Sequence, residues 1–222
     1  MILARCLVIA GAWLFTAVSA FAQPMQEARG APTGAFDFYV LALSWSPGFC
    51  EVSARGSERK QCEEGNRLGF VVHGLWPQSD QGYPTFCEPQ GRFVPRMVID
   101  QLVDLYPTSN LARYQWRKHG TCSGVSPSEY FALVRKARDR IQIPDSLTAS
   151  STETHVMPIE IERAFASANP GLRPDMMSVS CGRRVFQEIK ICLDKDLRGF
   201  RQCPQVNQDG CRAGEIAVPP PR

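Results

Sequence analysis

Histidine is scarce in this sequence, and the cysteine spacings typical of zinc sites are absent. The chain of 222 residues has nine cysteines and only three histidines. No two cysteines form a Cys-x-x-Cys pair, and the last four are spaced by eleven, eleven and eight positions, which does not suit a zinc finger. We therefore expect neither a metal site nor a cofactor.

The chain also lacks a large excess of charge of either sign. The formal net charge is +3, from 25 basic and 22 acidic side chains. A protein that coats nucleic acid by neutralising many phosphates is usually far more basic. A nucleic-acid ligand would therefore have to be held locally in a shaped site, as an enzyme holds its substrate.

Long apolar runs are missing beyond the N-terminal residues. Arg5 precedes an uncharged stretch over residues 7–21, and Ala20-Phe21-Ala22 has the small residues that a signal peptidase reads. The stretch is short for a bilayer span of about 20 residues. We interpret residues 1–22 as a cleaved secretory signal and expect no membrane anchor. Loss of Arg5 lowers the net charge to +2, and the remaining 200 residues suit one domain.

The cysteine count agrees with export. Cys6 lies in the expected signal, and an even number of cysteines in an exported chain indicates disulfides, here four. Eight cysteines allow 105 pairings, so the residues alone do not choose one. The chain has no Asn-x-Ser/Thr site, which favours a bacterial periplasm over the outside of the cell.

The order of helical and extended patterns favours an α+β fold. Strands are expected over residues 36–45, 68–73 and 185–193, with Gly74 ending the second. Helices are expected over residues 97–106, 111–119, 130–141 and 158–168, and a capping box at Ser126-Pro127-Ser128-Glu129 marks the start of the third. Helices in the middle and strands at both ends predict a mixed or antiparallel sheet.

Three segments lack a periodic pattern. Residues 23–35 are rich in Pro, Gly and Ala and are expected to form a flexible leader, and residues 146–154 a polar loop. The proline-rich residues 213–222 are expected to be a disordered tail. No repeat or linker divides the remaining chain, so we expect one domain over residues 36–212.

Two of the three histidines stand where a fold presents reactive groups. His73 closes an expected buried strand, and His119 closes an expected helix, one turn after Gln115 and next to Lys118. Histidine has an ordinary pKa near ~6.5, so one of a pair can be neutral while the other is charged, which suits acid–base catalysis. Cleavage of RNA by its own 2′-hydroxyl needs such a pair, and it needs neither a protein nucleophile nor a metal.

Three alternatives stay open on the residues alone. A histidine is more often a core or surface residue than a catalyst. The closeness of His119 and Cys122 suggests a Cys–His hydrolase, although in an oxidising compartment Cys122 is expected to be paired. A two-histidine metal site lacks carboxylates at useful spacing, and the third histidine, His155, lies in an expected polar region.

Two strings around these histidines resemble the active-site segments of the ribonuclease T2 family. They are Phe70-Val71-Val72-His73-Gly74-Leu75-Trp76-Pro77-Gln78 and Trp116-Arg117-Lys118-His119-Gly120-Thr121-Cys122. The segment 41–47 with Cys50, and the segment 191–194 with Cys203 and Pro204, are also similar to that family. The resemblance covers most of the chain after the expected signal.

The resemblance implies an endoribonuclease that cleaves single-stranded RNA with little base specificity through a 2′,3′-cyclic phosphate. The family's first histidine is the general acid and its second the general base, which gives these roles to His73 and His119. The lysine before the second histidine, here Lys118, stabilises the extra negative charge on phosphorus.

The resemblance also implies a base site and a fold. Trp76 matches the aromatic residue that stacks on the base 5′ to the cut, and Gln78 and Tyr83 fall near that base site. The fold is expected to be α+β, with a central antiparallel sheet flanked by helices, in a monomer without a stable protein partner. The implied disulfides are Cys50–Cys62, Cys87–Cys122, Cys181–Cys211 and Cys192–Cys203.

Tyr114 and Gln115 depart from the His-Glu pair usual in the family at these positions. A tyrosine hydroxyl can still donate a hydrogen bond to phosphate, without charge, and glutamine keeps the shape of glutamate but loses its ionisable group. The alternative is a weakened member that binds RNA or another ligand without cutting it. Retention of both histidines and Lys118 argues for the enzyme.

Overall fold

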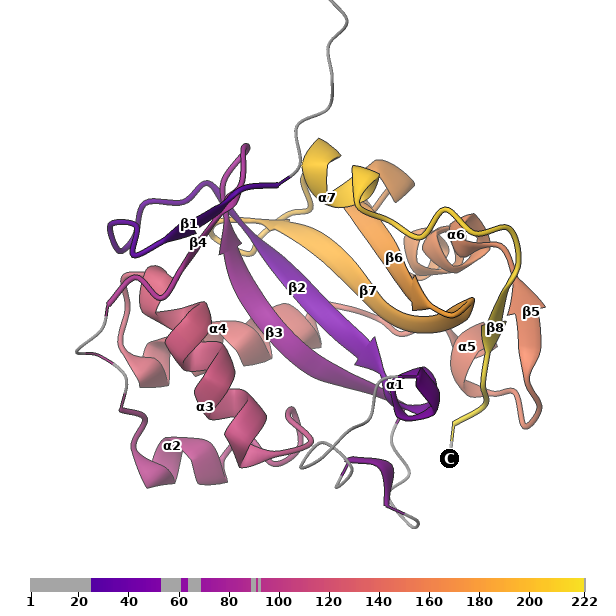
Figure 1. The fold of residues 1–222 in the computed structure, drawn as a ribbon, viewed down its shortest axis with the longest axis horizontal. Coiled ribbons are helices and arrows are strands. Elements are labelled where there is room, and N and C mark those ends of the chain that lie inside the picture. The colour runs from indigo at the N-terminus through magenta and orange to yellow at the C-terminus, as the bar shows by residue number, and fades with distance from the viewer. Residues whose placement is uncertain (1–24, 53–60, 64–68, 89–90, 92, 222) are drawn as a thin grey trace, which may run out of the picture.

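A computed structural model gives the fold and describes residues 25–52, 61–63, 69–88, 91 and 93–221 (Figure 1). The expected signal, residues 1–22, lies outside the described residues. Within these ranges, no helix is long and apolar enough to cross a bilayer.

A twisted sheet forms the centre of the molecule, and β2 (Phe38–Trp45) is one of its inner strands. Its neighbours β3 (Phe70–Gln78) and β7 (Val185–Asp194) both run antiparallel to it. The strand β6 (Met177–Gly182) pairs with β7, and β8 (Ile216–Val218) joins β7 to β5 (Thr154–Val156). The expected α+β fold with a central antiparallel sheet is confirmed, apart from a single parallel pairing between β7 and β8.

Helices lie against one face of this sheet and bury its apolar side (Figure 1). The longer ones are α3 (Ser109–Lys118), α4 (Pro127–Asp139) and α6 (Pro158–Ala168). The expected capping box begins α4: the Glu129 backbone N–H donates to Ser126 Oγ, and the Ser126 N–H donates to Glu129 Oε2 at 2.9 Å. Tyr130 and Val134 then pack from α4 into the core that Leu41 of β2 shares.

The alternation of β2 divides its side chains between two environments. Leu41, Leu43 and Trp45 are completely buried in the large core beneath the helices. Phe38 and Val40 point the other way into a small cluster with the Cys192–Cys203 disulfide and Val206. Towards the end of β2, the residues of this second face are small, Ala42 and Ser44. The second face therefore has room for side chains that reach across it from both neighbouring strands.

The strand β3 does not end at Gly74, contrary to the expectation, because it carries a β-bulge there. Leu43 pairs with Val72 and Ala42 pairs with Gly74, so His73 is the extra residue. The backbone N–H of Val72 turns away from the sheet and donates to Leu105 O at 3.0 Å. A bulge lets the strand continue while it changes the direction of one side chain.

Both ends of the described chain are more ordered than their composition predicts. Residues of the expected flexible leader form β1 (Glu27–Arg29), which pairs with β4 (Tyr83–Thr85). Residues of the expected disordered tail form β8, and the Trp45 indole donates to Pro219 O at 2.9 Å. These expectations were wrong because sheet pairing and a buried indole supply the partners that a proline-rich segment lacks on its own.

Two other expected elements differ in extent. The expected helix over residues 97–106 is helical only as α2 (Arg96–Asp100), and turns follow it. The expected loop over residues 146–154 contains most of α5 (Asp145–Thr148), and Thr154 already belongs to β5. Leu102 and Leu105 are buried although they lie in turns, which shows that helical spacing alone overstated the length of the helix.

The structure contains the four implied disulfides, Cys50–Cys62, Cys87–Cys122, Cys181–Cys211 and Cys192–Cys203. Cys87–Cys122 joins the segment after β4 to the short 3₁₀ helix η2 (Gly120–Cys122) that follows α3. Cys192–Cys203 joins β7 to the residue that precedes α7 (Pro204–Gln208). These two disulfides therefore fix η2 to the segment after β4 and fix the start of α7 to β7.

Replacement of Cys87 and Cys122 by alanine should lower the free energy of unfolding by about 2–5 kcal/mol, the range typical of native disulfides. The matched control removes Cys50 and Cys62. Their separation is 12 residues against 35, so the chain-entropy model expects the control to lose about 1 kcal/mol less. Urea unfolding of both double variants measures the difference, and a larger loss in the control would contradict the expectation.

Candidate functional site

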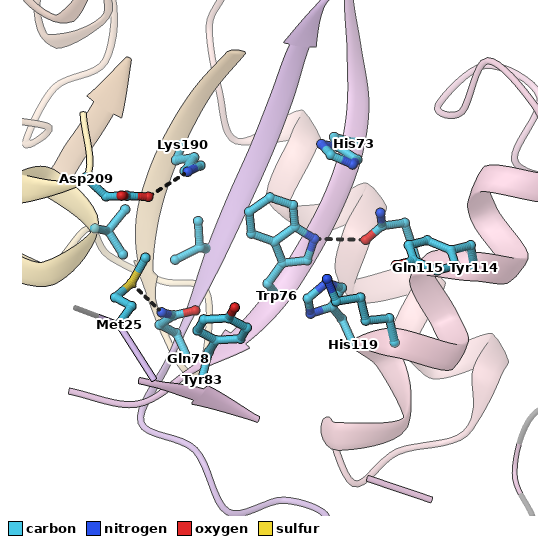
Figure 2. A pocket seen from close by; sticks show the side chains of 13 residues that line it. Met25, His73, Trp76, Gln78, Tyr83, Tyr114, Gln115, His119, Lys190 and Asp209 are labelled. Carbon is cyan, nitrogen blue, oxygen red and sulfur yellow. Dashed lines mark hydrogen bonds and ion pairs between the residues drawn. The ribbon is translucent and has the colours of Figure 1, made fainter. Parts of the chain in front are cut away.

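A cavity of about 340 Å³ lies on the second face of the sheet, against α3 and α7 (Figure 2). Its lining includes all eight residues that the sequence predicted to act in catalysis or substrate binding. They are His73, Trp76, Gln78, Tyr83, Tyr114, Gln115, Lys118 and His119. The structure also places Met25, Val40, Lys190, Val206 and Asp209 in the lining, none of which the sequence analysis identified.

His73 enters the cavity from the bulge of β3 and contacts a carboxylate. Its Nδ1 lies 2.6 Å from Glu188 Oε2. Glu188 belongs to β7, and its side chain is 12% exposed against 37% for His73. Glu188 is not among the site residues expected from the sequence, although its strand carried a signal: Glu188 and Lys190 alternate with the apolar Ile189 and Ile191.

His119 closes α3 and is buried, with 5% of its surface exposed. Burial, followed by the nearby charges of Lys118 and His73, lowers its pKa well below the usual 6.5. Its Nδ1 has no hydrogen-bond partner among the described residues. The imidazole is therefore neutral at neutral pH, which is the form that can accept a proton.

The backbone around His119 is fixed from several sides. The His119 N–H continues the helix by donating to Gln115 O at 2.9 Å, and the Phe86 N–H donates to Lys118 O at 2.8 Å. Directly after the histidine, a Cβ on Gly120 would lie 2.3 Å from the Trp116 ring, so only glycine fits there. The loop can thus pass closely behind the histidine without displacing it.

Trp76 lies between the two histidines (Figure 2). Its ring centroid is 5.3 Å from that of His73, edge to face, and 5.2 Å from that of His119, with the planes 28° apart. Its Nε1 donates to Gln115 Oε1 at 2.8 Å. A Cβ on Gly74 would meet both of these atoms at 2.3–2.4 Å, so Gly74 gives the pair its space. Gln115 is itself buried, with 1% of its surface exposed, so this hydrogen bond holds the indole in place.

The other end of the cavity is polar and holds a second charged pair. Gln78 Nε2 donates to Met25 Sδ at 3.3 Å, and Lys190 Nζ lies 3.6 Å from Asp209 Oδ2. Burial, then the charges of Glu27 and Asp209, raises the pKa of Tyr83 above its usual value of 10, so its hydroxyl stays protonated and can donate.

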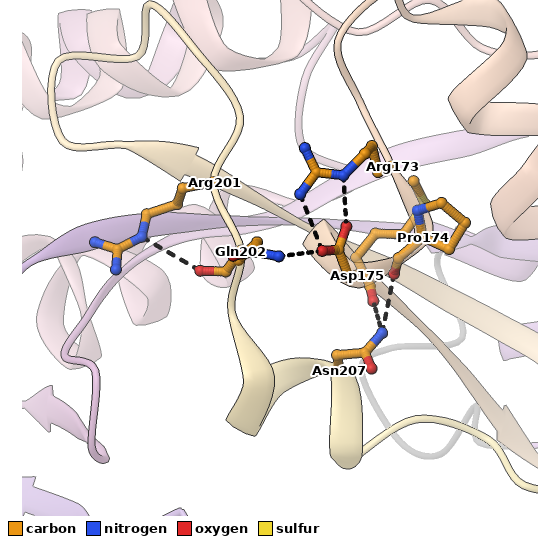
Figure 3. A network of polar contacts seen from close by, with 7 residues as sticks. Arg173, Pro174, Asp175, Arg201, Gln202 and Asn207 are labelled. Carbon is orange, nitrogen blue, oxygen red and sulfur yellow. Dashed lines mark hydrogen bonds and ion pairs between the residues drawn. The ribbon is translucent and has the colours of Figure 1, made fainter.

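The wall formed by Val206 and Asp209 is held by a network at the end of α7 (Figure 3). Asn207 Nδ2 donates to Pro174 O at 2.9 Å and to Met177 O at 2.8 Å. Asp175, in the adjoining 3₁₀ helix η3 (Pro174–Met176), accepts from Arg173 and Gln202. This network and the Cys192–Cys203 bond position α7 over the sheet.

The structure places the residues on which the alternatives for the histidines depend. His155 is on β5, largely exposed, with Glu153 at 3.6 Å, and it does not line the cavity. Cys122 is bonded to Cys87 and cannot act as a thiolate nucleophile. Among the described residues, no three His, Cys, Asp or Glu side chains are grouped so as to hold a metal ion. The cavity instead combines a buried neutral imidazole, a second imidazole held by a carboxylate, and the Lys118 ammonium.

Comparisons with known proteins agree with this geometry. The model of the ribonuclease T2 family matches residues 36–203. The chain is 36% identical over 172 residues to a ribonuclease from Aeromonas hydrophila, with 77% of each chain covered. It is 34% identical over 171 residues to a probable ribonuclease from Haemophilus influenzae, covering 72% of this chain and 58% of the other.

Solved structures share the fold. Trichomaglin, described as an S-like ribonuclease, superimposes with a TM-score of 0.66 at 24% identity, over 83% of this chain and 98% of its own. RNase NT in complex with 5′-AMP superimposes with a TM-score of 0.61 at 18% identity, over 84% and 98%. The chain belongs to the ribonuclease T2 family.

Replacement of Gln115 by glutamate should move the acidic limb of the kcat/KM pH profile upward. A carboxylate at this position favours the charged imidazolium and so raises the pKa of His119, which begins well below 6.5. The family resemblance makes His119 the expected base, and a base that must lose its proton becomes active only at higher pH. The profiles of both enzymes on a dinucleotide substrate measure the shift.

The control for this experiment is Gln115→Met, which removes the hydrogen bond to Trp76 without adding charge. It should lower the rate and leave the acidic limb in place. An unmoved limb in Gln115→Glu would show that residue 115 has no electrostatic influence on His119.

Proposed function

We propose that this endoribonuclease cleaves single-stranded RNA by transphosphorylation, with two histidines as acid and base and without a metal. The 2′-hydroxyl attacks phosphorus, the 5′-oxygen leaves, and a 2′,3′-cyclic phosphate forms, which water then opens to a 3′-phosphate. The observation that carries the proposal is the pair His73 and His119 in one cavity, with opposite electrostatic surroundings.

His119 is the base in this scheme and His73 is the acid. Burial keeps His119 neutral, so it can take the proton of the 2′-hydroxyl. His73 faces the same cavity with its Nδ1 against the Glu188 carboxylate, so its other ring nitrogen can carry the proton for the leaving 5′-oxygen. A substrate phosphate would lie between the two rings, beside Trp76.

Lys118 and Tyr114 serve the phosphate in this scheme. Both line the cavity, and Tyr114 is 40% exposed, so its hydroxyl is open to a ligand. A fixed ammonium stabilises charge that develops on phosphoryl oxygens, and a phenol can donate one hydrogen bond. Lys118 and Tyr114 would together stabilise the phosphate, for which the family usually has a lysine and a His-Glu pair.

Trp76 would bind a nucleobase on one side only, because His119 covers one face of the indole. Gln78 and Tyr83 line the same cavity beyond the indole (Figure 2). Stacking is worth about 1–3 kcal/mol for any base, which would account for weak base preference. The polar groups beyond the indole are those with which a stacked base could form hydrogen bonds.

We further propose that the protein works after export, in a periplasm or outside the cell. Four disulfides form and persist in an oxidising compartment, and residues 1–22 have the pattern of a secretory signal.

The second candidate is a member that binds RNA or another ligand without cutting it, and the neutral Gln115 is the observation that favours it. In the structure Gln115 keeps its contact with Trp76, so the rings of the site remain positioned without a carboxylate there. The two functions differ in whether incubation with RNA produces fragments.

Cleavage of total RNA by the purified protein should continue unchanged in excess EDTA, because substrate oxygen is the nucleophile and side chains carry the protons. Gel analysis of the fragments is the measurement. Absence of fragments with and without EDTA would favour the binding protein. Loss of cutting on chelation, with recovery on addition of zinc or magnesium, would instead indicate a metal-dependent mechanism.

Replacement of His73 or His119 by alanine should each lower kcat about 100-fold or more, as the removal of an acid or base usually does. His155→Ala is the matched control, because this histidine is exposed and outside the cavity. It should keep full activity. Unfolding curves establish that all three variants are folded. Normal cleavage by His73→Ala together with an inactive His155→Ala would overturn the site assignment.

A further inference from the structure

We infer that Glu188 is a positioning residue for His73, holding its Nδ1–H so that the ring releases its other proton, from Nε2, to the substrate. This inference rests on the proposed acid–base function. Its basis is the 2.6 Å contact between Glu188 Oε2 and His73 Nδ1, formed across the strand β2.

The contact is possible because the strand between the two residues carries small side chains. His73 is on β3 and Glu188 is on β7, with β2 between them. Glu188 is in register with Ser44, and on the other side Ala42 pairs with Gly74. Neighbouring strands lie about 4.8 Å apart, so both side chains must extend over β2 to meet. A large residue at position 42 or 44 would stand in their path.

The bulge of β3 is the second part of this arrangement. Val72 and Leu75 are both buried in the large core, and strict alternation back from Leu75 would turn residue 73 towards that core as well. The extra residue at the bulge breaks the alternation, so Val72 keeps its core position and His73 lines the cavity on the opposite face. The backbone irregularity and the carboxylate therefore act on the same side chain.

The other charged and polar side chains near Glu188 contact partners of their own, so His73 is its neighbour for a hydrogen bond. Lys190, two residues further along the same face of β7, lies against Asp209, the carboxylate at the far end of the cavity. Gln115 is neutral and accepts from Trp76. With 12% of its side chain exposed, Glu188 is also largely shielded from water. Shielding strengthens a hydrogen bond to a charged group.

The chemistry follows from the fact that an ionised carboxylate only accepts hydrogen bonds. The protonated imidazole carries one hydrogen on each nitrogen. Glu188 retains the hydrogen on Nδ1, so the proton that leaves is the one on Nε2, and it goes to the 5′-oxygen. The neutral ring that remains is the Nδ1–H tautomer, whose bare Nε2 can then take a proton from the water that opens the cyclic phosphate.

The test compares Glu188→Leu, which removes the acceptor, with Glu188→Gln, whose amide oxygen can still accept. Loss of the carboxylate that orients a metal-bound histidine costs about 10- to 100-fold, and we take the same range for an orienting partner of His73. We expect kcat to fall by that factor in Glu188→Leu with KM unchanged, and to fall less in Glu188→Gln. Glu162→Leu is the matched control: this half-buried carboxylate on α6 accepts from the Val179 N–H, away from the cavity. It should affect stability alone.

A spectroscopic measurement separates positioning from a merely structural role. The ¹⁵N shifts of the His73 ring, assigned by comparison with His73→Ala, should report the Nδ1–H tautomer when the ring is neutral. Glu188→Leu should convert part of the population to the Nε2–H tautomer in a protein that is still folded. An unchanged tautomer, or a kcat equal to that of the parent enzyme, would overturn the inference.

Failure of the inference differs from failure of the proposed function. If His73→Ala is inactive while Glu188→Leu has a normal kcat, the acid is correctly assigned and the role of Glu188 is wrong. If His73→Ala cleaves RNA normally, the acid itself is wrong, whatever the tautomer in the glutamate variants.

Discussion

The extra residue in β3 is the constraint on which the site depends. A sheet built from β2, β3 and β7 buries one side of every strand beneath helices, and regular alternation would bury residue 73 with Leu75. The bulge releases this position while Val72 remains in the core. Because β2 presents only Ala42 and Ser44 at this level, the released imidazole meets a carboxylate from the strand beyond. The β-bulge at His73 thus determines both the packing of Val72 in the core and the direction of the His73 side chain in the cavity.

The two imidazoles differ because the fold surrounds them differently. His119 follows the last turn of α3, and its burial, together with the nearby charges of Lys118 and His73, disfavours its charged form. His73 is more exposed and has an anionic partner. Trp76 stands between them and is itself fixed by Gln115. Under the proposed mechanism, this difference in surroundings divides the roles of acid and base between two residues of the same type.

Local chemistry made several elements predictable, and long-range contacts explain the others. The alternation in β2, the capping box at Ser126 and the two histidine strings are all written in short stretches of sequence. Gly74 was interpreted as a strand end because glycine commonly ends elements, whereas its function here is to make room for Trp76 and Gln115. Glu188 lies 115 positions from His73, and only the pairing of β7 with β2 brings them together. The tail likewise gains its order from Trp45, a residue far away in the chain.

The order in which the strands appear along the chain has a consequence for how the molecule folds. The strand β2 is among the first elements, yet its pairing with β7 joins positions as far apart as Phe38 and Asp194. Contacts of such long range make folding slow, because the intervening loop must close before they can form. Until β7 arrives, one edge of β2 has no strand to pair with and can associate with other chains. A chain exported N-terminus first, as proposed, would complete its sheet only after most of it has crossed the membrane, so the cavity would be among the last features to form.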